Sequence, residues 1–70
     1  IVIVAYLKGM KANVSIRGNV DVREMTLQAI RNISGATGGG HKHATGAQVP
    51  VEFLPRFKED IARMIKEKLG

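Results

Sequence analysis

Residues 1–17 read IVIVAYLKGMKANVSIR, and this stretch decides the fold class. An unbroken apolar run rich in β-branched residues occupies positions 1–7, which is typical of a strand buried on both faces and therefore central in a sheet. Residues 8–11, Lys-Gly-Met-Lys, indicate a short turn. Apolar and polar residues then alternate from Ala12 to Arg17, as in a half-buried strand. The stretch predicts a β-hairpin.

Two helices are expected after the hairpin. Asp21, followed three residues later by Glu24, fits a capping box and predicts a helix that runs to about Ile33 and ends at Ser34-Gly35. Apolar residues recur in it at helical spacing and should face the sheet: Val22, Met25, Ala29, Ile30 and Ile33. Pro55 predicts the start of a final helix. The apolar face of that helix would consist of Leu54, Phe57, Ile61, Met64, Ile65 and Leu69.

A glycine-rich loop is expected between the helices at residues 35–43, followed by a short strand at 46–51. The predicted order is therefore β-β-α-loop-β-α. A small mixed β-sheet with helices packed on it, an α/β fold of the α+β type, would bury every apolar stripe. Residues 1–70 suffice for a single domain. Because the sequence starts inside a predicted strand without Met, we expect it to be a C-terminal fragment of a longer protein.

The segment Gly38-Gly39-Gly40-His41 is the most informative one for function. Glycine adopts positive φ freely and has no Cβ, so a glycine run lets backbone N–H groups approach a ligand and point the same way. Such groups bind anions in phosphate loops. His41 adds a side chain that donates to an anion or exchanges a proton near neutral pH. These residues predict an anion-binding loop, and a flexible surface linker is the alternative.

Ser15 and Arg17 lie two residues apart on the predicted strand, so their side chains share one face. Arginine offers a planar fork of donors that fits phosphate bidentately, and serine adds a hydroxyl. If this face opens toward the glycine loop, the two residues, the amides of Gly38, Gly39 and Gly40, and His41 would form one anion pocket. The alternative is an exposed polar strand face without a ligand.

Charge and composition narrow the function classes. The net charge is +5, and residues 1–50 hold six of the eleven Lys and Arg residues against only Asp21 and Glu24. This excess favours an anionic partner, nucleic acid or nucleotide first, although charge for solubility is the alternative. The chain has no cysteine, which excludes disulfides and thiolate metal sites. Aromatic residues make up 4%, too few for a platform that stacks several bases.

Other classes of site find little support. His41 and His43 have the spacing of a metal-binding pair, but no Asp or Glu lies near them, so no metal site is expected in this chain. No nucleophile, base and acid occur in a catalytic arrangement. The longest apolar run is far too short to span a membrane, so we expect no membrane partner and a cytoplasmic location.

These residues resemble the DHHA1 domain, the C-terminal substrate-binding domain of DHH-family phosphoesterases, which include RecJ-like exonucleases and oligoribonucleases. The resemblance rests on Ser15-Ile16-Arg17, a helix, Gly38-Gly39-Gly40-His41 and then Ala44-Thr45-Gly46-Ala47, and it extends from about Ile3 to Lys66. Two positions depart from the family pattern. Thr37 stands where many members have a further glycine, and Thr45 replaces a smaller residue.

The resemblance implies a function for each motif. An N-terminal DHH domain of the same protein would hold a two-manganese centre, and nucleic acid or nucleotide would lie between the two domains. Gly38, Gly39, Gly40 and His41 would bind near the scissile phosphate, and Ser15 with Arg17 would hold an adjacent phosphate or terminal nucleotide. His41 would stabilise charge on the transferring phosphoryl group. The expected substrates are single-stranded nucleic acid, short oligonucleotides or small nucleotides, cleaved by the parent protein as an exonuclease or phosphatase.

Two other functions stay open. A related domain occurs in alanyl-tRNA synthetases, so the chain could be an RNA-binding module with no hydrolase activity. It could also be a structural or dimerisation module. A homodimer is expected only if the apolar first strand lies at the sheet edge and pairs with another chain.

Overall fold

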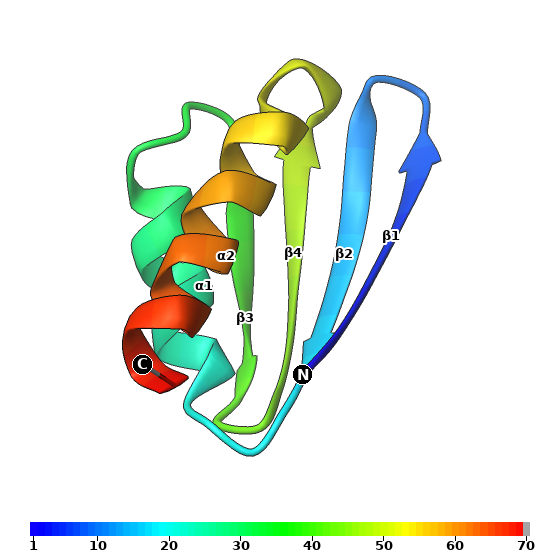
Figure 1. Ribbon diagram of the computed structural model, residues 1–70. Helices are drawn as coiled ribbons and strands as arrows, with labels where there is room; N and C mark the ends of the chain where they lie inside the picture. The colour runs from blue at the N-terminus through cyan, green and yellow to red at the C-terminus, as the bar shows by residue number, and fades with distance from the viewer. Residues whose placement is uncertain (70) are drawn as a thin grey trace.

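The computed structural model describes residues 1–69 and shows a four-stranded sheet with two helices packed on it (Figure 1). In chain order the elements are β1 (Val2–Lys8), β2 (Lys11–Arg17), α1 (Val22–Arg31), β3 (Thr37–His41), β4 (Ala44–Pro50), the 3₁₀ helix η1 (Val51–Phe53) and α2 (Leu54–Leu69). The strands lie in the order β1-β2-β4-β3, and each neighbouring pair is antiparallel. The predicted α+β class is confirmed.

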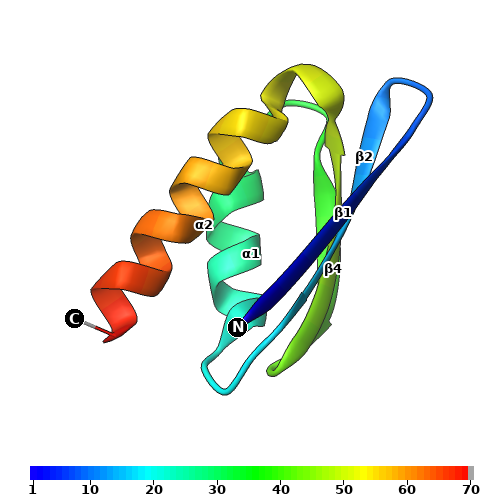
Figure 2. The same cartoon turned by 45° about the vertical axis from the view of Figure 1, so that its right-hand side comes forward.

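Both helices cover the same face of the sheet, and the opposite face is uncovered (Figure 2). Helix α1 packs against β3 and β4, and α2 packs against α1 and β4. Every second residue of β2 and β4 points toward the helices and is buried: Ala12, Val14, Ile16, Thr45, Ala47 and Val49. The predicted half-buried strand at 12–17 is therefore confirmed.

The helices contribute the other half of the core. Its fully buried helical residues include Val22, Met25 and Ala29 of α1, and Phe57 and Ile61 of α2. The predicted apolar faces are thus confirmed, with a partly buried margin formed by Ile30, Leu54, Met64 and Ile65. The side chain of Leu69 lies outside the described part of the chain.

Strand β1 is an exposed edge strand, which corrects the prediction that residues 1–7 are buried on both faces. All seven of its residues are exposed, and Leu7 retains 62% of its accessible surface. The reason is the placement of the helices over β3 and β4 (Figure 1), which leaves β1 beyond their reach. The hairpin itself is confirmed, because β1 pairs with β2 along its whole length, and Gly9 (φ +62°) turns the chain.

Residues 37–41 form strand β3, which corrects the prediction of a loop over 35–43 and excludes a flexible linker. Strand β3 pairs with β4 from Thr37 opposite Gln48 to His41 opposite Ala44. The two-residue turn between them is fixed by its backbone. The Lys42 carbonyl accepts a hydrogen bond from the Val22 amide at 2.9 Å, at the start of α1. The glycine run is therefore held within the sheet.

The N-terminus of α1 is capped as predicted. The Glu24 amide donates to Asp21 Oδ1 at 2.9 Å, which satisfies one of the free N–H groups of the first turn. The reciprocal bond of a capping box does not form, because Glu24 Oε1 accepts from Gln28 Nε2 at 3.1 Å instead. Helix α1 ends at Arg31, slightly before the predicted end, and Pro55 lies in the first turn of α2 as predicted.

Thr26 offers a test of the core. Its side chain is fully buried, and Oγ1 finds no hydrogen-bond partner within residues 1–69. A buried hydroxyl without a partner costs about 1–3 kcal/mol. Thr26→Val, which keeps the shape, should therefore raise the free energy of unfolding by about 1 kcal/mol and the melting temperature by about 4–8 °C. Circular dichroism during heating measures this shift.

The matched control is Thr26→Ser, which keeps the hydroxyl and removes a buried methyl group. It should lower the melting temperature, because the lost apolar contact leaves a small cavity. If Thr26→Val melts lower than the natural chain, Oγ1 must have a partner that the structure does not show.

Candidate functional site

The face of the sheet opposite the helices, here called the open face, carries most of the residues predicted to bind an anion. Residues directly opposite each other on antiparallel strands point to the same face, so the strand registers define rows across the sheet. One row holds Arg17, Ala44 and His41, and the next holds Ser15, Gly46 and Gly39. Arg17 and His41 thus lie on either side of β4, about 10 Å apart at Cα.

The three glycines of β3 differ in their surroundings, which corrects the prediction that their amides point the same way. Because successive residues of a strand alternate between faces, only Gly39 belongs to the open face. A Cβ on Gly38 would lie 2.9 Å from the Gly46 carbonyl oxygen and 3.2 Å from Ile30 Cδ1. Gly40 has φ +148°, a conformation that favours glycine. The lack of a Cβ at Gly38 and Gly40 therefore serves packing and backbone geometry, and the backbone of Gly38 still borders a hollow on the open face.

Gly39 and Gly46 form a floor without side chains in the middle of the open face. They are paired across β3 and β4, and a Cβ on Gly39 would meet no atom within 4 Å. Thr45 stabilises the position of Gly39 from the buried side of the sheet, because its Oγ1 donates to the Gly39 carbonyl oxygen at 2.8 Å. The bond gives a structural reason for a hydroxyl at position 45. A ligand on the floor can therefore approach the backbone closely.

The open face is basic and carries no acidic side chain. The six acidic residues lie in α1, η1 and α2 or directly before α1: Asp21, Glu24, Glu52, Glu59, Asp60 and Glu67. Within residues 1–69, both ion pairs involve Arg63 of α2, so the Arg17 guanidinium has no carboxylate partner. The positive charge of Arg17 is therefore available to attract an anion.

A hollow of about 370 Å³ lies on the open face beside Ser15. The hollow is shallow and open to solvent. Side chains from all four strands surround it: Tyr6, Asn13, Thr37 and Gln48. The sequence analysis did not predict these four residues as part of a site. The available signal was the alternation of Asn13 with Ser15, together with the hairpin pairing that sets Tyr6 opposite Asn13.

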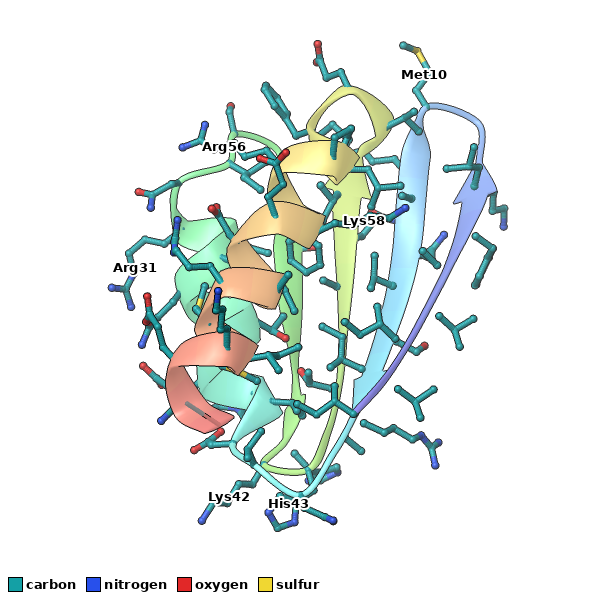
Figure 3. All side chains as sticks on the ribbon, viewed as in Figure 1. Met10, Arg31, Lys42, His43, Arg56 and Lys58 are labelled. Atoms are coloured by element: carbon teal, nitrogen blue, oxygen red, sulfur yellow. The ribbon has the colours of Figure 1, made fainter. Side chains whose placement is uncertain are left out.

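His43 does not join the site. It lies in the turn between β3 and β4, where the side chains of His43 and Lys42 point away from the end of the sheet (Figure 3). No cluster of three or more His, Cys, Asp or Glu residues suited to a metal ion occurs in residues 1–69. None of the helices in that range is both long and apolar enough to cross a membrane.

The structure thus brings Ser15, Arg17, Gly39 and His41 to one face, with Gly38 lining the hollow beside Ser15, while Gly40 belongs to the other face. A family model described as the DHHA1 domain matches residues 1–67. The chain belongs to the DHHA1 family. DHHA1 domains are associated with DHH-family phosphoesterases, are partnered with an N-terminal DHH domain and bind nucleotides or nucleic acids. No curated protein gives a significant match to the chain.

One glycine of this DHHA1 domain that faces inward, Gly38, and one that faces outward, Gly39, give a test of the site geometry. Gly38→Ala would push a methyl group against the Gly46 backbone and should lower the free energy of unfolding by about 1–3 kcal/mol. Gly39→Ala adds its methyl group in open space and should change stability by no more than about 0.5 kcal/mol. Urea denaturation measures both. Equal losses in the two variants would contradict the assignment of faces.

Proposed function

We propose that the open face binds the phosphate-bearing end of single-stranded nucleic acid, a short oligonucleotide or a small nucleotide. In this proposal the chain is the substrate-binding half of a manganese-dependent DHH-family phosphoesterase. The observation that carries the proposal is the gathering of Arg17, Ser15, Gly39 and His41 on one basic face without acidic side chains.

Arg17 is the proposed primary phosphate ligand. Its side chain is exposed and has no ion-pair partner in residues 1–69. A guanidinium can bind two phosphate oxygens at once, which fixes both position and orientation. Ser15 follows on the same face of β2 and would add one hydroxyl donor. The floor at Gly39 would let the phosphate lie close to the backbone, where a Cβ would otherwise hold it away.

His41 approaches the same phosphate from the other side of β4. Its imidazole would donate to a phosphate oxygen and so stabilise negative charge that develops during transfer of the phosphoryl group. Because residues 1–69 contain no metal-binding cluster, the manganese ions would belong to the DHH domain. There they would supply the activated water. This division of tasks implies that the present chain binds substrate without hydrolysing it.

Arg17→Gln tests the phosphate site against a matched loss of charge elsewhere. Hydrogen bonds to charged groups contribute about 1.5–3 kcal/mol, so the affinity for adenosine 5′-monophosphate should fall at least about tenfold. Arg31→Gln is the control, because Arg31 belongs to α1 and points away from the sheet (Figure 3). It should change the affinity less than about twofold. Isothermal titration calorimetry at low ionic strength measures both variants.

Equal losses in the two variants would show that net charge, rather than the open face, binds the nucleotide. A chain that binds structured RNA much more tightly than the mononucleotide, with no effect of Arg17→Gln, would favour an RNA-binding module over the phosphoesterase role.

A further inference from the structure

We propose that the hollow lined by Tyr6, Asn13, Thr37 and Gln48 is the seat of the nucleobase attached to the bound phosphate. This inference rests on the proposed function and names the part of the ligand that the phosphate row leaves unexplained. The four side chains form the row next to Ser15, Gly46 and Gly39 on the open face. The base would therefore lie beside the phosphate rather than across the sheet from it.

The spacing of the rows fits one nucleotide. Residues on the same face of a strand are two positions apart, so adjacent rows are separated by roughly 7 Å. The hollow reaches the floor row, because Ser15 and Gly46 also line it, and Arg17 and His41 lie one row further on. A phosphate over the floor, held by Ser15 and by the long Arg17 side chain, would place its sugar and base over the hollow.

The charge of the lining favours a base over a second phosphate. No lysine or arginine lines the hollow, although strands β1 and β2 carry three such residues elsewhere: Lys8, Lys11 and Arg17. Lys11 is also engaged, because its Nζ donates to the Gly35 carbonyl at 3.1 Å. An uncharged, polar and flat group therefore matches the hollow better than an anion does.

Asn13 and Gln48 offer the hydrogen bonds that a base edge requires. Gln48 Nε2 donates to Asn13 Oδ1 at 3.4 Å, a long bond that holds the two amides side by side. It leaves the Asn13 Nδ2 donor and the Gln48 Oε1 acceptor without a protein partner in residues 1–69. Nucleobase edges present donors and acceptors next to each other, and side-chain amides of Asn and Gln are common partners for them.

Tyr6 supplies the stacking surface. Its side chain is 60% exposed and stands directly opposite Asn13, at the β1 side of the hollow. Bases of single-stranded nucleic acids stack on aromatic rings with little dependence on sequence. The two phenylalanines lie in η1 and α2, so Tyr6 is the one Phe, Tyr or Trp side chain on the open face within residues 1–69. One ring accommodates one base, which suits a single terminal nucleotide rather than a long tract.

Two ligands distinguish the contribution of the base to the affinity from that of the phosphate. Adenosine 5′-monophosphate and ribose 5-phosphate share the phosphate and sugar and differ in the base. We expect the natural chain to bind the nucleotide about tenfold more tightly, within the range of stacking contributions. Tyr6→Leu should reduce the nucleotide affinity to that of ribose 5-phosphate and leave the affinity for ribose 5-phosphate unchanged. Asn13→Ala should reduce the nucleotide affinity alone, by about fivefold.

Leu7→Ala is the matched control on β1. Leu7 is exposed to a similar degree as Tyr6 but points to the opposite face of the strand, so both affinities should stay unchanged. Circular dichroism confirms that each variant is folded before the titrations.

Each other outcome overturns the proposal in a distinct way. Equal affinities of the natural chain for the two ligands would exclude a base site and leave the phosphate site intact. An advantage of the nucleotide that survives both Tyr6→Leu and Asn13→Ala would place the base elsewhere. Failure of both ligands to bind would overturn the base site together with the proposed function.

Discussion

The burial of one face of β2 and β4 beneath the two helices is the constraint on which the open face depends. Val14 and Ile16 pack into the core with Phe57, so the residues on either side of Ile16 must point the other way. Those residues are Ser15 and Arg17. A register shift by one residue would bury both of them and expose the core residues. Both changes would lower the free energy of unfolding. The core and the site are thus fixed by the same register.

Strand β3 shows how three adjacent glycines can do different things. Gly38 leaves room for Ile30 of α1, and Gly40 adopts a backbone conformation that other residues avoid. Gly39 faces outward and leaves the floor of the site free of side chains. The glycine run therefore allows helix packing on one face and leaves the backbone open on the other, because strand geometry assigns alternate residues to opposite faces.

The sequence was sufficient for the features encoded in neighbouring residues. The alternation over 12–17 predicted the shared face of Ser15 and Arg17, and Asp21 predicted the start of α1. Strand β3 could not be predicted, because glycine has no side chain to show alternation and pairs here through its partner β4. The exposure of β1 depends on where the helices pack. The hollow joins residues from four strands. The hairpin pattern reveals only the pairing of Tyr6 with Asn13, and no local pattern reveals the register of β2 with β4 or of β4 with β3.

The most direct test of the open face is a residue-resolved NMR titration of the chain with a 5′-phosphorylated single-stranded dinucleotide. The account predicts chemical-shift changes that converge on Ser15, Arg17, Gly39 and His41, with the outward side of α2 unaffected. Saturable changes centred on α2, around Arg56 and Lys58, with none on the open face, would contradict it.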